Sequence, residues 1–189
     1  MEKRINTSVF ISGRGSNLKS LYKFSKSKKT PIKINLIVTD NKDALGLKFV
    51  KKKKIKLLIV NYKNILSAEK LILKLMSKES IQLICLAGFM KILTKKFIKS
   101  FKGKIINIHP SLLPKFKGLN TFSRMITNKE KKGGCTVHFV NKKLDGGNTI
   151  VQKKFFINSK DNEEVLKIKT QKLEYQAFPE AIIKIFRNN

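Results

Sequence analysis

The sequence has 189 residues, which is enough for one domain with a well-buried core but short for two. Its formal net charge of +30 comes from 42 Lys and Arg against 12 Asp and Glu, but 38 of these cations are lysines scattered along the chain. Scattered lysines are typical of a solvated surface and of AT-rich codon usage, so we expect no dedicated nucleic-acid role. No apolar run has the length of a membrane span or a signal peptide, so we expect a cytoplasmic protein with no membrane partner.

Strand and helix patterns alternate through the first half of the chain. The predicted strands cover residues 5–11, 32–39, 56–60 and 81–87, and the predicted helices start after Ser16 and cover 44–50, 68–78 and 94–100. Cys85 lies within an apolar strand pattern, where a free thiol behaves as a small core residue. Alternation of this kind predicts an open, mostly parallel sheet with helices on both faces.

The second half of the chain changes character after a short strand at 104–106. That strand is predicted to break at Asn107, where a loop stiffened by Pro110 and Pro114 begins. A helix at 121–128 follows, then two strands at 135–140 and 149–157, a helix at 162–176 and a further helical turn after Pro179. The last two strands are predicted to be antiparallel. The fold class is therefore α/β, a single domain over 1–189 with a twisted, mostly parallel sheet and antiparallel C-terminal strands.

Four unusual loops follow predicted strands, at residues 12–17, 86–93, 107–114 and 142–147. In an open parallel sheet, ligands bind outside the carboxyl ends of the strands. We therefore expect these four loops to gather on one rim of the sheet and to form the functional site.

The first of these loops is rich in glycine and opens a helix. Gly13, Arg14, Gly15, Ser16 and Asn17 place backbone N–H groups, a cation and a positive helix dipole together, which favours binding of a phosphate. The spacing fits neither a dinucleotide fingerprint nor a Walker loop. The simpler alternative is a turn that merely joins the strand to its helix.

Asn107, His109 and Asp145 offer a donor for an oxyanion, a base and a carboxylate, the groups that acyl-transfer chemistry needs. Taken singly, each has a structural explanation as a turn residue. Together on one rim they would form a catalytic set. His138 alternates with Val137 and Phe139 in a strand and is expected to be structural or at most pocket-lining. The two histidines and two cysteines lack metal-ligand spacing, so no metal is expected.

The segments SGRGSN, LAGFMKIL, NIHPSLLPKFKG, GCTVHFV and LDGG occur in this order over nearly the whole chain. In this combination the sequence resembles the phosphoribosylglycinamide formyltransferases, the folate-dependent family of purine synthesis. The resemblance implies that the formyl group of 10-formyltetrahydrofolate passes directly to the amine of glycinamide ribonucleotide (GAR) through a tetrahedral intermediate, without a metal.

The same resemblance assigns roles to particular residues. Asn107, His109 and Asp145 match the family's catalytic trio, in which a protonated His109 donates to the oxyanion and Asp145 raises its pKa. Residues 13–17 match the phosphate loop for GAR, and Glu174 matches the acid that contacts the ribonucleotide. The residues that match the folate pocket are Met90, Lys91, Ile92, Leu93, Asn141, Lys142, Lys143 and Leu144.

Several alternatives stay open at this level. The acceptor could be methionyl-tRNA or an amino sugar nucleotide, although the tRNA enzyme would need a second domain after the catalytic one. From another class, the charge permits a basic nucleic-acid-binding protein, but four arginines and no tryptophan argue against it. The chain departs from the family pattern at Asn120–Phe122 and at Tyr175, where relatives often have histidine, and at Lys63, the candidate for a missing arginine. We expect a monomer or a homodimer.

Overall fold

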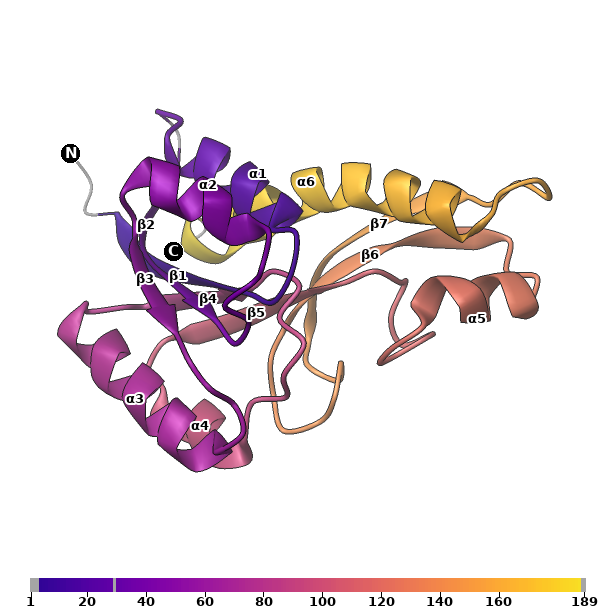
Figure 1. Cartoon of the computed structure of the whole chain (residues 1–189). Coiled ribbons are helices and arrows are strands. Elements are labelled where there is room, and N and C mark those ends of the chain that lie inside the picture. The colour runs from indigo at the N-terminus through magenta and orange to yellow at the C-terminus, as the bar shows by residue number, and fades with distance from the viewer. Residues whose placement is uncertain (1–3, 29, 188–189) are drawn as a thin grey trace. The chain divides into compact units, whose positions relative to one another are not determined.

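The computed structural model describes residues 4–28 and 30–187, and its strands form a sheet in the order β3-β2-β1-β4-β5-β6-β7 (Figure 1). The strands are β1 (Ile5–Ile11), β2 (Ile32–Thr39), β3 (Lys56–Ile59), β4 (Leu83–Leu86), β5 (Lys104–His109), β6 (Lys132–Phe139) and β7 (Thr149–Phe156). The helices are α1 (Ser16–Ser25), α2 (Gly46–Lys53), α3 (Ile65–Lys78), α4 (Lys95–Ser100), α5 (Thr121–Thr127) and α6 (Glu163–Arg187). The chain divides into two compact units, Met1–Ile106 and Asn107–Asn189.

The first unit is a parallel sheet covered on both faces. β1 pairs in parallel with β2 and with β4, and β2 pairs in parallel with β3. Helices α1 and α2 lie on one face of these strands, and α3 and α4 lie on the other (Figure 1). Val9, Phe10 and Ile11 are consecutive and fully buried because a strand covered on both faces hides every side chain.

The second unit contains the antiparallel pair. β6 and β7 run antiparallel, from Lys132 opposite Phe156 to His138 opposite Thr149. Helix α6 packs along both strands and also contacts α5. The predicted fold class, mostly parallel with antiparallel C-terminal strands, is confirmed.

Strand β5 is longer than predicted. The break expected at Asn107 is wrong, because the strand continues to His109 and stops only at Pro110, which has no N–H for the ladder. Ile106 and Ile108 alternate with Asn107 and His109, and both isoleucines are buried. The polar residues therefore belong to the strand, and burial of the intervening isoleucines explains why it extends.

Helix α6 is also continuous where two pieces were predicted. It runs from Glu163 to Arg187 with Pro179 inside it. A proline removes one helical hydrogen bond, but Ala177, Phe178 and Ala181 on either side of it are almost fully buried. Packing of this face outweighs the local loss, so the helix does not end at Gln176.

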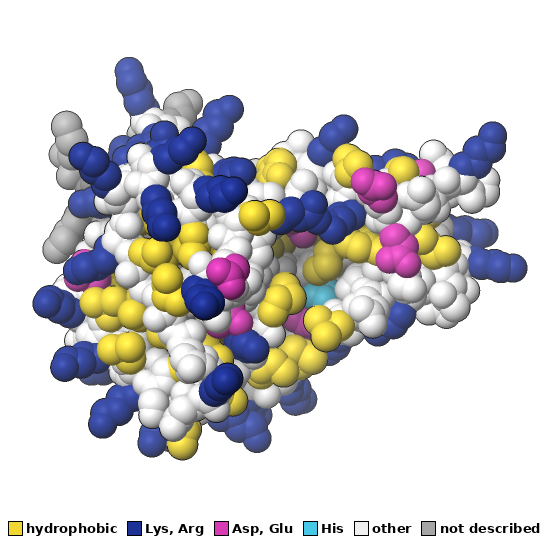
Figure 2. Space-filling view, in the orientation of Figure 1, with side chains coloured by type: hydrophobic (Ala, Val, Ile, Leu, Met, Phe, Trp, Pro, Cys, Tyr) yellow, Lys and Arg dark blue, Asp and Glu magenta, His cyan; other side chains and the backbone are white. Residues whose placement is uncertain are grey.

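The surface is dominated by cations. Figure 2 shows Lys and Arg side chains spread over the visible face of both units, without a single concentrated patch. Within residues 4–28 and 30–187, no helix is both long and apolar enough to cross a membrane.

Candidate active site

Strand β5 presents Asn107 and His109 on the same side, because side chains two residues apart in a strand share a face. His109 is buried and Asn107 is half-buried. Pro110 ends the strand immediately after His109. Both groups are therefore mounted on a rigid element rather than in the loop that we predicted.

Asp145 comes from the turn between β6 and β7. Its φ of +44° is left-handed, a conformation that Asp tolerates better than most residues. The side chain of Asn141 holds this turn, since its Nδ2 donates to the Gly146 carbonyl at 3.0 Å and its Oδ1 accepts from the Lys143 N–H at 2.8 Å. The loop geometry thus orients Asp145 toward β5.

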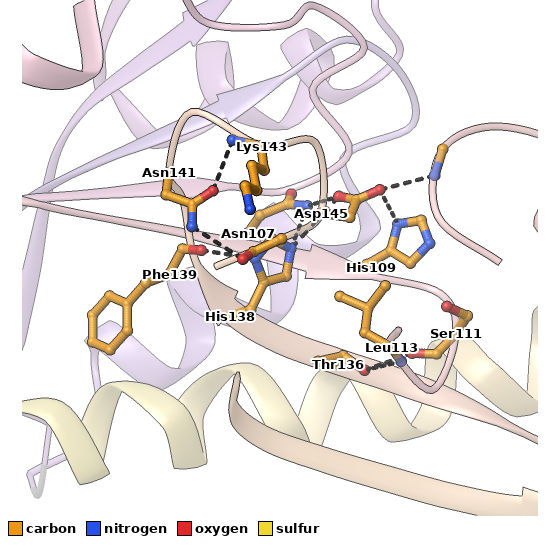
Figure 3. A network of polar contacts seen from close by, with 12 residues as sticks. Asn107, His109, Ser111, Leu113, Thr136, His138, Phe139, Asn141, Lys143 and Asp145 are labelled. Atoms are coloured by element: carbon orange, nitrogen blue, oxygen red, sulfur yellow. Dashed lines mark hydrogen bonds and ion pairs between the residues drawn. The ribbon is translucent and has the colours of Figure 1, made fainter. Parts of the chain in front are cut away.

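The structure brings the predicted trio together (Figure 3). Asp145 Oδ2 lies 3.3 Å from His109 Nδ1 and accepts the Gly118 N–H at 2.9 Å. Asp145 Oδ1 accepts from Asn107 Nδ2 at 3.4 Å. Residues 38 positions apart in the sequence therefore meet around one carboxylate.

Opposing effects set the pKa values of this pair. Burial would raise the pKa of Asp145, but the interactions with His138, the Gly118 N–H and His109 outweigh it and lower the pKa to about 2. Burial lowers the pKa of His109, although the Phe116 carbonyl and the Asp145 charge act to raise it. The expected effect of Asp145 is present, but burial exceeds it, so the resting imidazole is less readily protonated than we predicted.

Both ring nitrogens of His109 nevertheless face acceptors. Nε2 lies 2.8 Å from the Phe116 carbonyl oxygen, and Nδ1 faces Asp145. A neutral ring can donate to only one of them, whereas an imidazolium can donate to both. The surroundings are therefore suited to hold a proton that His109 receives during a reaction.

His138 belongs to the same network, although its alternation in the strand predicted only a structural or pocket-lining residue. Its Nδ1 lies 2.8 Å from the Phe139 carbonyl, so Nδ1 bears the hydrogen and Nε2 of a neutral ring is an acceptor. Nε2 lies 3.2 Å from Asn107 Nδ2 and 3.6 Å from Asp145 Oδ1. A neutral His138 can therefore accept from the Asn107 amide, whereas a protonated ring would direct its Nε2–H toward Asp145 Oδ1 instead. The strand alternation placed His138 on a buried face, but only the folded chain shows which residue it meets.

A second set of polar contacts shapes the segment after β5. Thr136 Oγ1 donates to the Ser111 carbonyl at 2.6 Å and accepts from the Leu113 N–H at 3.0 Å. Gln152 Nε2 donates to the same Thr136 oxygen at 2.9 Å. These bonds tie the segment to β6 and β7 a few residues before Phe116, whose carbonyl faces His109.

The glycine loop lies in the first unit, between β1 and α1. Gly15 is the N-cap of α1 with φ of +70°, and a Cβ there would come within 2.9 Å of the Gly46 backbone. Among the described residues, no side chain caps α1 and its first turn has no acid. Gly13 and Arg14 are exposed, Ser16 is half-exposed and Asn17 is buried. The helix end can therefore receive an anion.

The Met90–Leu93 segment also lies in the first unit. Met90 and Ile92 are 63% and 70% exposed, unusual values for large apolar side chains, whereas Leu93 is buried in the core. Lys91 is exposed as well. Met90 and Ile92 are thus available to cover an apolar ligand, and the Leu93 side chain is not.

The remaining predicted residues lie in the second unit. Lys142, Lys143 and Leu144 are exposed on the loop before Asp145. Glu174 is half-buried on α6, near enough to Cys135 of β6 to contribute to the raised pKa of that thiol, whose main cause is burial. In the part of the chain that the structure describes, no group of three or more His, Cys, Asp or Glu could hold a metal ion.

With this geometry in place, comparison with known proteins identifies the family. A family model described as formyl transferase matches residues 5–182. The chain belongs to the formyl transferase family. The predicted enzyme class, a transferase, is confirmed.

The sequence of this formyl transferase is also similar to those of individual proteins of known name. It is 41% identical over 181 residues to the phosphoribosylglycinamide formyltransferase of Haemophilus influenzae, covering 94% of this chain and 85% of that protein. It is 33% identical to the trifunctional purine biosynthetic protein adenosine-3 of Homo sapiens, of which it covers only 18%. The match to that larger protein is therefore confined to a small part of it.

Solved structures extend the similarity to the fold. The phosphoribosylglycinamide formyltransferase of Anaplasma phagocytophilum superposes with a TM-score of 0.91 at 35% identity, over 98% of this chain and 88% of that one. The phosphoribosylglycinamide formyltransferase of Brucella melitensis also superposes with a TM-score of 0.91, at 33% identity, over 99% of this chain and 97% of that one. This formyl transferase therefore has the same fold as enzymes named for formyl transfer to phosphoribosylglycinamide.

Proposed function

We propose that this protein transfers the formyl group of 10-formyltetrahydrofolate to the amine of GAR, giving formyl-GAR and tetrahydrofolate in purine biosynthesis. The observation that supports this most strongly is the contact of Asp145 with both His109 and Asn107 on β5. Relatives named for formyl transfer to phosphoribosylglycinamide support the choice of acceptor, and the resemblance of the sequence to a folate-dependent family supports the choice of donor. Purine synthesis and two buried free cysteines also favour the cytoplasm as its location.

The trio accounts for the chemistry of the transfer. The acceptor amine attacks the formyl carbon, and the carbonyl oxygen gains negative charge. Asn107 Nδ2 donates to that oxygen, a contribution of about 3 kcal/mol for a donor of this kind. Both hydrogens of this amide have partners in the present structure, so the weaker bond at 3.4 Å to Asp145 is the one that Asn107 exchanges.

His109 and Asp145 move the proton. His109 accepts a proton from the amine at Nε2, which exchanges its contact with the Phe116 carbonyl for the substrate, while Nδ1–H of the resulting imidazolium donates to Asp145. Asp145 is ionised at neutral pH because its pKa is about 2, so it stabilises that charge. The tetrahedral intermediate then collapses, the bond between the formyl carbon and the folate nitrogen breaks, and His109 gives the proton to that leaving nitrogen.

The other assigned residues bind the substrates. The uncapped end of α1 with Gly13, Arg14, Gly15, Ser16 and Asn17 receives the phosphate of GAR, and Glu174 contacts its ribonucleotide portion. We assign the exposed apolar side chains of Met90 and Ile92, in the first unit, to contact with the folate, and the family resemblance assigns the exposed Leu144, in the second unit, to the same ligand. The other residues assigned to the folate pocket contribute through their backbone and through the shape of their loops. They are Lys91, Leu93, Asn141, Lys142 and Lys143. The protein acts as a monomer or a homodimer.

The direct test is to mix the purified protein with 10-formyltetrahydrofolate and GAR and follow the folate absorbance. His109→Ala and Asp145→Asn should each lower kcat by about 10²-fold or more, since they remove acid–base groups. Lys154→Ala, an exposed change on β7, is the matched control and should retain activity. Equal rates for wild type and both site variants would overturn the mechanism, and activity with only methionyl-tRNA or an amino sugar nucleotide would change the acceptor.

A further inference from the structure

Residues that follow three neighbouring strands of the first unit are joined by hydrogen bonds. Ser12 follows β1, Asp40 follows β2, and Met90 comes after β4. Ser12 Oγ donates to Asp40 Oδ1 at 2.5 Å and accepts the Met90 N–H at 2.9 Å. A chain of hydrogen bonds therefore runs from the Met90–Leu93 segment through Ser12, at the start of the glycine loop, to Asp40.

The second oxygen of Asp40 reaches the same segment. Lys91 Nζ lies 3.7 Å from Asp40 Oδ2, and the Asp40 side chain is only 9% exposed whereas that of Lys91 is 46% exposed. Asn41 adds a further bond, because its Nδ2 donates to the Ser12 carbonyl at 3.1 Å. One largely buried carboxylate thus contacts both the residue that starts the glycine loop and the segment with exposed Met90 and Ile92.

We propose that Asp40 is a positioning residue for the donor site, which holds the Met90–Leu93 segment in its binding conformation through Ser12 and Lys91. The inference rests on the proposed function, in which that segment covers the folate. Asp40 itself touches no substrate. Its carboxylate fixes the direction of the Ser12 hydroxyl, so that the oxygen lone pair points at the Met90 N–H.

Without the Asp40 carboxylate, the Met90–Leu93 segment would become ordered only when the folate binds. The Ser12 hydroxyl could then rotate, and the Lys91 ammonium would lose its counter-charge. Binding of the donor would have to supply the ordering entropy of the segment, which lowers affinity without altering the reacting groups. The effect should therefore fall on the KM of the donor rather than on kcat.

The test compares Asp40→Asn, Ser12→Ala and the double variant, with KM for each substrate, kcat and the thermal midpoint as readouts. Asp40→Asn should raise the KM for 10-formyltetrahydrofolate about tenfold, while kcat and the KM for GAR change less than about threefold. Asp40→Asn keeps an oxygen that accepts from Ser12, but more weakly than a carboxylate, and loses the charge that faces Lys91. The double variant should be little worse than Asp40→Asn, because both changes weaken one chain of bonds. Asp43→Asn removes an exposed charge from the same turn and is the matched control.

Calorimetric titration of tetrahydrofolate separates this inference from the proposed function. If wild type is active and Asp40→Asn leaves the affinity for tetrahydrofolate unchanged, the inference is wrong. If Asp40→Asn weakens the binding of both substrates equally and lowers the thermal midpoint, Asp40 is merely structural and the inference is also wrong. If wild type neither binds tetrahydrofolate nor transfers the formyl group, the proposed function fails and the inference falls with it.

Discussion

The two oxygens of Asp145 have different partners, and this division determines what each neighbouring side chain can do. Oδ2 faces His109 and the Gly118 N–H, whereas Oδ1 faces Asn107 and His138. The carboxylate thus orients the proposed base with one oxygen and the proposed oxyanion donor with the other. The roles of His109 and Asn107 in the proposed reaction therefore depend on which of their atoms carry hydrogens.

His138 should affect catalysis through Asn107. His138→Phe removes the acceptor for one Asn107 amide hydrogen at 3.2 Å, so the amide becomes free to turn. We expect kcat to fall about tenfold or more with a smaller change in KM, since loss of one oxyanion donor typically costs 10²–10³. His138→Gln, whose Oε1 can accept from Asn107, should restore part of the rate. Steady-state kinetics of both variants would check this, and full activity of His138→Phe would refute it.

Asp145 should make stability depend on pH in the acid range. Its pKa in the folded protein is about 2 and its ordinary value is 3.8, so the ionised form is favoured by folding. The resulting stabilisation, on the order of 2 kcal/mol, is present above pH 3.8 and is lost as the pH falls toward 2.

Urea unfolding of wild type and Asp145→Asn at several pH values would measure this contribution. The difference in unfolding free energy should be largest near neutral pH and should shrink as the pH falls below 4. A difference that grows with acidity would contradict the assigned direction of the shift.

At the scale of elements, the turn between β6 and β7 is the feature that delivers Asp145. Asn141 bonds to Gly146 and to Lys143 within the turn, and the Phe139 N–H donates to the Asn148 carbonyl at 3.0 Å. These bonds close the turn where the strands meet. The position of the carboxylate therefore depends on backbone geometry rather than on its own side-chain contacts alone.

Gly147 should be intolerant of a side chain for this reason. A Cβ at Gly147 would lie 1.7 Å from the Phe139 carbonyl oxygen, so the backbone of the turn would have to move. Gly147→Ala should lower the free energy of unfolding by at least about 2 kcal/mol and reduce kcat, because Asp145 moves with the turn. Gly13→Ala is the stability control, since nothing lies within 4 Å of a Cβ there. Chemical denaturation of both variants would check the contrast, and equal stability would refute it.

At the scale of the whole molecule, the chain comprises two compact units joined within β5. The single domain over 1–189 that the sequence predicts remains a proposal. A strand that contributes to both units gives a physical reason for them to unfold together, because neither could lose β5 without exposing buried apolar side chains.

Cooperative unfolding would test the single-domain proposal. We expect one calorimetric transition with an enthalpy of about 130 kcal/mol for a chain of this length, equal to the van't Hoff enthalpy. The measurement belongs in roughly 0.2 M salt, which screens the repulsion of a chain with net charge +30. Two separated transitions would show that the units are independent domains.

The order of strands and helices could be predicted from the apolar periodicity along the chain, because that periodicity reflects local burial. The sequence also singled out Asn107, His109 and Asp145 as polar residues beside strand ends. The folded chain was needed to find the end of β5, the continuity of α6 through Pro179 and the partners of His138. Each depends on side chains distant in sequence: burial extends β5 and α6, and the meeting of β5, β6 and the turn after β6 determines which atoms bond. A linear pattern contains no information on those encounters, so the site's residues could be predicted but not its network of hydrogen bonds.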